Sequence, residues 1–334
     1  MSRRIFGILP DGTQVEALTL SGGGLRAEVL TYGAVVRDLR LEGHAPPLVL
    51  GFETLEDYLG HSRNHGATCG RVANRIGNGR FSLDGRDYAL ELNEKGVTHS
   101  HGGSRGMAKR VWKVEEHGAD RLTLSIHDPA GQAGYPGAVD SLCHMRLADG
   151  GLEITYESRV DAPTLVNLCH HGYFNLDGGP DILSHRMRID AGAYLPVNAL
   201  KVPTGEIAPV SGTAFDLRDA TILGDRMAEA GIAFDHNFCL SEGTVDLRPV
   251  AWAESPASGV TLEVLTTEPG VQLFCAVGMV IGVPGLGGRD YGSAAGFCLE
   301  TQIWPDAINH PGFPDLVLRP GEVRRQATVY RFSR

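Results

Sequence analysis

Five short segments of the sequence place polar, titratable side chains next to apolar residues, a pattern expected where folding brings reactive groups to a cleft. The segments are 74–75, 99–103, 170–171, 235–237 and 300–302. Together they offer carboxylates that can accept protons, imidazoles that titrate near neutral pH, and a guanidinium and amides that donate hydrogen bonds. This set of groups suits general acid–base chemistry on a ligand rich in hydroxyl groups.

Glu300 is the most informative of the carboxylates. In an extended strand, Cys298, Glu300 and Gln302 share one face, because side chains alternate along a strand. A carboxylate on such a face is expected to project into a cleft. The alternative is an ion pair between Glu300 and an arginine at the edge of a sheet.

The histidines allow two kinds of site. His170 and His171 are adjacent, so in a strand they point to opposite sides and only one of them can face a site. Either one could instead be an interior histidine with satisfied hydrogen bonds. His99 and His101 could supply two metal ligands from one strand face, but no third ligand stands at a recognised spacing. We therefore expect no bound metal.

Arg75 follows Asn74 and precedes a glycine-rich turn. Its guanidinium could donate two parallel hydrogen bonds to vicinal hydroxyl groups, or it could hold loop carbonyls together. The glycine pairs at 102–103 and 178–179 lack the spacing and the following helix of a phosphate-binding loop, so no nucleotide is expected.

The elements that must position these groups are predicted to be mainly strands. An Asp-Gly turn at 84–85 predicts a hairpin over residues 81–90, and the uncharged stretch 269–288 suggests a pair of buried strands. Only residues 219–230 have a helical pattern over more than two turns. Period-2 alternation, typical of strands with one exposed face, occurs at 122–126, 152–159 and 260–264.

Composition agrees with an all-β fold. The 334 residues include 44 Gly and 18 Pro, which implies many turns and few, short helices. We find no repeat, low-complexity tract or linker that divides the chain. Residues 1–334 are therefore expected to form a single domain, a large antiparallel β-sandwich whose loops supply the site.

Charge and cysteine content exclude several kinds of partner. The net charge of −10 disfavours nucleic acid. Residues 1–12 lack the apolar core of a signal peptide, and Gln272 and Pro284 interrupt the longest uncharged stretch, so we expect neither secretion nor a membrane span. The six cysteines contain no C-x-x-C pair and are expected to be reduced thiols of a cytoplasmic protein.

Seven segments and a C-terminal tail together carry a family resemblance. They are GRVANRIG at 70–77, GRFSLDG at 79–85, HGG at 101–103, GYPG at 134–137, VNLCHHGYFNL at 166–176, FDHNF at 234–238, LETQ at 299–302, and NHPGFP and LRPGE at 309–314 and 318–322. In this order they resemble the aldose 1-epimerase (galactose mutarotase) family over about residues 66–322.

The resemblance implies an antiparallel β-supersandwich and an isomerase that interconverts the α and β anomers of a free aldose such as galactose or glucose, without a cofactor. Transferred position by position, Glu300 resembles the general base and His171 the general acid. The partner is then a small monosaccharide, and the chain is expected to be a monomer or a homodimer. The positions that resemble substrate-binding residues are Asn74, Arg75, His101, Asp235 and Gln272.

Three other functions remain open on sequence grounds. The chain departs from the family pattern at His99, Ser100 and His170 and in the segment after Gln272, which leaves the preferred aldose open and allows a sugar-binding module without catalysis. A sugar-phosphate 1-epimerase would need clustered cations, for which Arg71 and Arg75 are the obvious pair. A glycosidase could use Asp235 and Glu300 as its two carboxylates.

Overall fold

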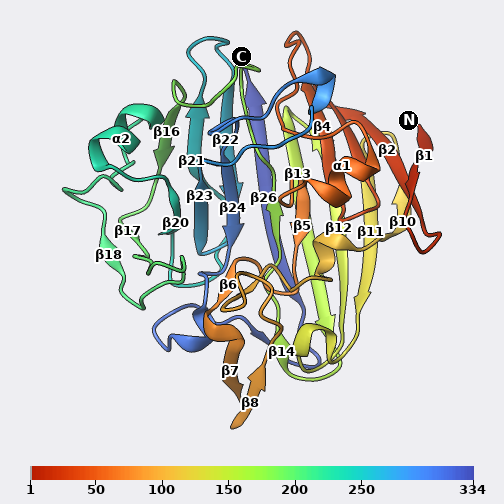
Figure 1. The fold of residues 1–334 in the computed structure, drawn as a ribbon, viewed down its shortest axis with the longest axis vertical. Helices are drawn as coiled ribbons and strands as arrows, with labels where there is room; N and C mark the ends of the chain where they lie inside the picture. The colour runs from red at the N-terminus through yellow and green to blue at the C-terminus, as the bar shows by residue number, and fades with distance from the viewer. Residues whose placement is uncertain (1) are drawn as a thin grey trace.

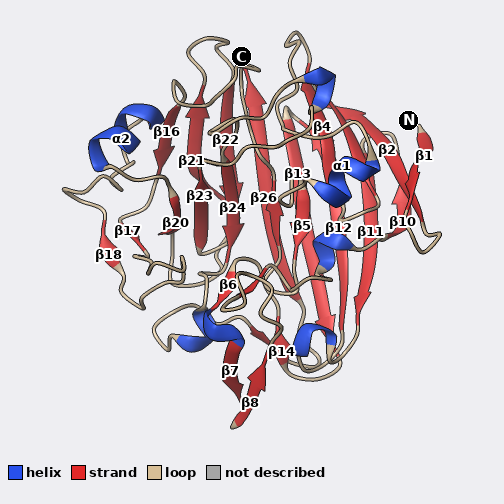
Figure 2. Cartoon of the chain, in the orientation of Figure 1, coloured by secondary structure: helices blue, strands red, loops and turns tan. Residues whose placement is uncertain are grey.

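Antiparallel strands are the main secondary structure of the computed structural model, which describes residues 2–334, and the helical segments are short (Figures 1 and 2). This arrangement confirms the all-β prediction. Among residues 2–334, no helix has both the length and the hydropathy needed to cross a bilayer.

The largest sheet has nine antiparallel strands. The C-terminal strand lies in the middle of this sheet, between β13 and β22. Every second residue of β13 is buried, as predicted for 152–159. In spatial order the strands are β10 (Lys113–His117), β11 (Arg121–Asp128), β12 (Val139–Ala148), β13 (Gly151–Val160), β26 (Arg324–Ser333), β22 (Thr261–Thr266), β21 (Arg248–Glu254), β16 (Arg186–Ile189) and β19 (Thr221–Ile222).

Three smaller sheets pack against this one. The main hydrophobic core takes side chains from the nine-stranded sheet and from the four- and five-stranded sheets, so these sheets face each other across one core. The smaller sheets are β1 (Arg3–Ile8), β2 (Gln14–Gly22), β3 (Leu25–Leu30) and β4 (Val35–Leu41); β15 (Cys169–His171) with β5 (Ala67–Cys69); and β18 (Ala208–Pro209), β17 (Ala193–Tyr194), β20 (Asp235–Cys239), β23 (Gly270–Phe274) and β24 (Cys298–Gln302).

Short pairs and helical turns connect the sheets. The hairpin β7–β8 confirms the prediction for residues 81–90 and projects at the bottom of Figure 1. The strand pairs are β6 (Arg75–Ile76) with β9 (His99–Ser100), β7 (Arg80–Leu83) with β8 (Arg86–Ala89), and β14 (Thr164–Leu165) with β25 (Val317–Leu318). The helical segments are α1 (Leu55–Gly60), α2 (Leu223–Ala230), η1 (Gly77–Gly79), η2 (Met107–Lys109), η3 (Gln132–Gly134), η4 (Leu286–Gly288) and η5 (Ala307–Asn309).

Two local predictions need correction. The helix predicted over 219–230 begins only at Leu223, because Thr221 and Ile222 pair with β16, and it ends where Gly231 adopts a left-handed conformation. The second buried strand predicted within 269–288 is wrong. Strand β23 ends at Phe274, and Ala276 then takes a positive φ of 39°, which turns the chain out of the sheet.

Candidate active site

A pocket of about 260 Å³ brings together six of the seven residues that the sequence singled out. They come from five separate regions of the chain, which the smaller sheets and the β6–β9 pair bring to one place. The six are Asn74, Arg75, His101, His171, Asp235 and Glu300.

The five-stranded sheet forms one wall of this pocket. Gln272 of β23 is the register partner of Glu300 of β24 and of Asn237 of β20, so these side chains share one face of the sheet with Asp235. The seventh predicted residue, Gln272, is only 3% exposed and lies behind Asp235. Its Nε2 donates to Asp235 Oδ1 at 2.7 Å, so the contact seen for Gln272 orients Asp235.

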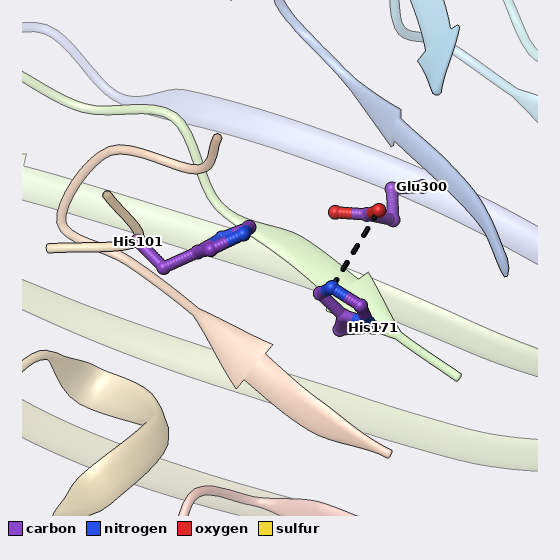
Figure 3. A group of neighbouring side chains, drawn as sticks. All are labelled: His101, His171 and Glu300. Atoms are coloured by element: carbon purple, nitrogen blue, oxygen red, sulfur yellow. Dashed lines mark ion pairs between the residues drawn. The ribbon is translucent and has the colours of Figure 1, made fainter. Parts of the chain in front are cut away.

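Glu300 and His171 lie side by side on adjacent strands. Nε2 of His171 on β15 lies 3.6 Å from Oε1 of Glu300, and Figure 3 shows the imidazole directed at the carboxylate. Burial raises the pKa of Glu300 above its ordinary value, and the nearby His171 opposes that rise. A buried carboxylate with a raised pKa is a stronger base than an exposed one once it is ionised. The sheet-edge arginine pair considered for Glu300 is therefore not formed: its ion-pair partner is His171.

The two neighbouring histidines point to opposite sides, as predicted. His170 packs against Tyr330 in the interior, and neither of its ring nitrogens has a hydrogen-bond partner among the described residues. Burial lowers the pKa of His170 to about 3, so this ring stays neutral.

His101 is locked to Asn74 by two hydrogen bonds. The backbone N–H of Asn74 donates to His101 Nδ1 at 3.2 Å, and the backbone N–H of His101 donates to the Asn74 carbonyl at 2.9 Å. Since a backbone N–H can only donate, the neutral ring must carry its proton on Nε2. Burial, together with His171, holds the pKa of His101 well below its ordinary value. His101 is thus a fixed neutral donor.

Arg75 is held by a carboxylate that the sequence analysis missed. Its Nε and Nη2 donate to the two oxygens of Glu94 at 2.7 and 2.9 Å, while Nη1 lies 3.8 Å from Asp235 Oδ2. Burial lowers the pKa of Arg75, but the bond to Glu94 and the charge of Asp235 more than offset this, so the pKa is raised overall. The guanidinium of Arg75 thus binds a carboxylate instead of loop carbonyls, and its Nη1 remains for a ligand.

Aromatic rings support His171 from behind. Tyr173 stacks on His171 with ring centroids 5.1 Å apart, and His65 stacks on Tyr173 at 4.1 Å. Tyr173 also donates from Oη to the Arg63 carbonyl at 2.9 Å. Tyr173 lies in the same motif as His171 and could have been found there, whereas no spacing marked Glu94 or the pocket residue Phe274.

The structure changes the metal hypothesis. Among the described residues, the predicted pair His99–His101 does not form a ligand set, because the group of close potential ligand atoms contains His101 but not His99. Potential ligand atoms of His101, His171 and Glu300 do lie within 4.8 Å of one another. However, the Nδ1 contact keeps the His101 proton on Nε2, and a protonated ring nitrogen does not coordinate a metal.

The cation pair considered for a phosphorylated sugar is not in the pocket. Arg71 is 1% exposed and donates to Asp128 Oδ2 at 2.8 Å and to the carbonyls of Pro136 and Gly137. Its role is to connect loops. The cations that do line the pocket with Arg75 are Arg63 and Lys109.

Comparison with known proteins gives consistent matches over the whole chain. A family model described as aldose 1-epimerase matches residues 16–331. The chain is 42% identical to the galactose mutarotases of Bos taurus and Homo sapiens, each match covering 100% of the chain and 98% of the relative. It is 33% identical to the aldose 1-epimerase of Escherichia coli (strain K12), with 97% of both proteins covered.

Solved structures show the same architecture. An aldose epimerase homologue from C. elegans superposes with a TM-score of 0.89 at 29% identity and covers 95% of this chain and 98% of that one. Galactose 1-epimerase from Lactobacillus acidophilus NCFM superposes with a TM-score of 0.85 at 26% identity and covers 99% of this chain and 98% of that one. The fold is thus of the galactose mutarotase type, as the sequence resemblance implied.

Proposed function

Because the chain belongs to the aldose 1-epimerase family and is a mutarotase, we propose that Glu300 and His171 carry the proton transfers of anomer interconversion. The observation that supports this most directly is the 3.6 Å separation between His171 Nε2 and Glu300 Oε1. At that separation each group can reach a different oxygen of one hemiacetal.

The proposed reaction opens and closes the sugar ring. Glu300 takes the proton of the C1 hydroxyl while His171 protonates the ring oxygen, so the C1–ring oxygen bond breaks and an aldehyde forms. Rotation about the C1–C2 bond presents the other face of the carbonyl group. Ring closure then reverses both proton transfers and gives the other anomer. Both side chains thereby return to their starting protonation states, and no cofactor is required.

The hydrogen bonds favour His171 over His101 as the proposed acid, although His101 is also near Glu300. An acid must hold an extra proton in one state and lose it in the other. The backbone N–H of Asn74 blocks a proton at His101 Nδ1, so His101 cannot become an imidazolium without breaking that bond. His171 Nδ1 faces the thiol of Cys298 and has no such restriction. His101 is therefore proposed as a neutral donor to a sugar hydroxyl or to the ring oxygen.

The remaining pocket residues are proposed to orient the sugar. Asp235 can accept from hydroxyl groups, with Gln272 fixing its rotamer. Arg75 Nη1 and the side-chain amide of Asn74 can donate, because the Asn74 side-chain oxygen already accepts from the backbone N–H of Arg75. We propose a neutral free hexose, galactose or glucose, as the substrate, since the curated relatives with 42% identity are galactose mutarotases.

We also propose that residues 1–334 act as one domain in the cytoplasm, as a monomer or a homodimer. A single core shared by the nine-stranded sheet and the smaller sheets supports one domain. The six cysteines are free thiols, which fits a reducing compartment.

Polarimetry on freshly dissolved α-galactose and α-glucose tests this proposal. Glu300→Gln and His171→Gln keep the side-chain size nearly constant and are expected to lower kcat by about 10²- to 10⁴-fold, the usual contribution of positioned proton transfer. His170→Asn is the matched control, because it changes the adjacent ring on the opposite face and should leave the rate near wild type. A Glu300→Gln variant as fast as wild type would refute the base assignment.

Three further measurements separate the alternatives. Calorimetric sugar binding without acceleration of mutarotation would indicate a binding module. Equal rates on free and phosphorylated sugar would point to the sugar-phosphate reaction, and release of reducing sugar from a nitrophenyl glycoside would point to a glycosidase. We expect acceleration on free sugar, a lower rate on phosphorylated sugar, and no glycoside cleavage.

A further inference from the structure

Two buried thiols border the proposed acid and base. Sγ of Cys298 lies 3.5 Å from Nδ1 of His171, and Sγ of Cys169 lies 3.5 Å from Oε2 of Glu300. The two cysteines are 0% and 1% exposed. Burial raises the pKa of both thiols well above the ordinary value, so both remain protonated at neutral pH.

A protonated thiol differs from most neighbours of a buried titratable group. It can donate its S–H proton or accept a hydrogen bond at sulfur, and both interactions are weak. A backbone N–H can only donate and a carbonyl can only accept, so each favours one protonation state of its partner. His101, with the N–H of Asn74 against Nδ1, illustrates the first case within the same pocket.

We propose that Cys298 and Cys169 are positioning residues that hold His171 and Glu300 in place through both protonation states of the reaction. This inference rests on the proposed function, because it assumes that His171 and Glu300 exchange protons with the substrate. Neither thiol touches the sugar or gives up a proton to it.

The proposal specifies the proton positions on His171. His171 gives up and takes back the proton on Nε2, the nitrogen that faces Glu300 in Figure 3, so the neutral ring keeps its proton on Nδ1 and donates it to the sulfur of Cys298. In the imidazolium, the Nδ1–H donates to the sulfur of Cys298. The ring therefore keeps one orientation, and Nε2 points to the position of the substrate both with its proton and after the proton has been transferred. For Glu300, the thiol of Cys169 donates to the carboxylate and accepts from the carboxylic acid.

Other charged and titratable groups also face this pair and set the background for any pH profile. They are His101 next to β9, Tyr173 and His65 stacked behind His171, Asp235 on β20 and Arg75 on β6. None of these groups contacts His171 Nδ1 or Glu300 Oε2 through a hydrogen bond among residues 2–334, so the thiols are the neighbours to change.

Paired alanine and serine variants of each cysteine test the proposal. Alanine removes the hydrogen bond, whereas serine keeps a group that both donates and accepts. We expect Cys298→Ala and Cys169→Ala to lower kcat by about 3- to 10-fold, the effect of one ordinary hydrogen bond. The kcat–pH profile should also change: Cys298→Ala should shift the midpoint that reports His171, and Cys169→Ala the midpoint that reports Glu300. The serine variants should stay within about 2-fold of wild type. Cys143→Ala and Cys143→Ser provide the control, since Cys143 is 0% exposed and lies on β12 of the nine-stranded sheet.

Nitrogen-15 NMR of the histidine rings provides a readout that does not depend on activity. In the wild type, neutral His171 should carry its proton on Nδ1, and Cys298→Ala should allow the other tautomer to appear. The tautomer can be measured even if the protein does not accelerate mutarotation, so failure of the proposed function and failure of this inference are distinguishable.

Several results would overturn the inference. It is wrong if the alanine variants retain the wild-type rate and pH profile, or if alanine and serine variants lose activity equally, because the effect would then be one of packing. It is also wrong if neutral His171 in the wild type carries its proton on Nε2. If Cys298→Ala fails to fold, the inference is still tested by the tautomer of His171 in the wild type and by the mutarotation rate of Cys298→Ser.

Discussion

Replacement of Glu94 by Gln is expected to weaken sugar binding more than catalysis. Glu94 accepts from Arg75 Nε and Nη2 at 2.7 and 2.9 Å and from Thr98 Oγ1 at 2.8 Å. The substitution keeps the size of the side chain but puts an NH₂ group against the guanidinium. Arg75 then loses the partner that fixes the plane of its guanidinium group. It is free to turn toward Asp235, whose Oδ2 lies 3.8 Å from Arg75 Nη1.

The exposure of the pair sets the size of the effect. The side chains of Arg75 and Glu94 are 16% and 29% exposed. Hydrogen bonds to charged groups contribute about 1.5–3 kcal/mol when buried, and exposed ion pairs contribute about 0.2–1 kcal/mol. A half-buried bidentate pair should fall between these ranges, at about 1–2 kcal/mol. At about 1.4 kcal/mol for each factor of ten, KM should rise by about 5- to 30-fold. The value of kcat should change by less than about threefold, because Glu300 and His171 stay in place.

Steady-state polarimetry, which separates KM from kcat, measures this effect. Asp84→Asn is the matched control, because Asp84 makes a similar two-point pair with Arg319 at 2.9 and 2.7 Å far from the pocket. Both variants should unfold near the wild-type temperature, and only Glu94→Gln should have a raised KM. The reasoning would be refuted if Glu94→Gln kept the wild-type KM, or if kcat fell while KM did not change.

Three further predictions concern pH and packing. Since burial raises the pKa of Glu300 above 4.5, and the base must be ionised, kcat/KM should fall with decreasing pH at a midpoint above 4.5; a midpoint at or below that value would contradict the assignment. His170 has a pKa of about 3 in the folded protein against 6.5 when unfolded, so the unfolded chain binds more protons between these values and the free energy of unfolding decreases as pH falls below 6.5. Between pH 7.5 and pH 5.5, the free energy of unfolding measured in urea should fall by about 1.4 kcal/mol less for His170→Asn than for the wild type. Equal decreases in the two proteins would contradict this prediction. A Cβ at Gly270 would lie 2.5 Å from Asn237 Oδ1, so Gly270→Ala should cost about 1–3 kcal/mol of stability in a thermal melt, whereas Gly292→Ala, with open space at that position, should be neutral.

The sequence was sufficient for the fold class and for the choice of acid and base candidates. Alternation and turn residues depend on neighbours within a few positions, and for that reason 81–90 and 152–159 were predicted correctly as strands. The same local information failed after Phe274. The apolar residues there suggested a strand, but a positive φ at Ala276 turns the chain away from the sheet.

The adjacency of His170 and His171 also predicted how their two rings are oriented. Neighbouring residues of a strand must point to opposite faces, so the sequence alone predicted that only one of the two rings can face the site. Which ring does so depends on which face of β15 is covered by the core, and this was decided by packing against Tyr330.

Only the tertiary structure decided how the site residues are held. The contact of Arg75 with Glu94 spans 19 positions, that of Gln272 with Asp235 spans 37, and that of Cys298 with His171 spans 127. No periodic pattern encodes such contacts, because they join residues that are far apart in the sequence. The residue types determined which chemistry is possible in this protein. The long-range contacts determined which imidazole can change its protonation state and which guanidinium nitrogen remains free for a ligand.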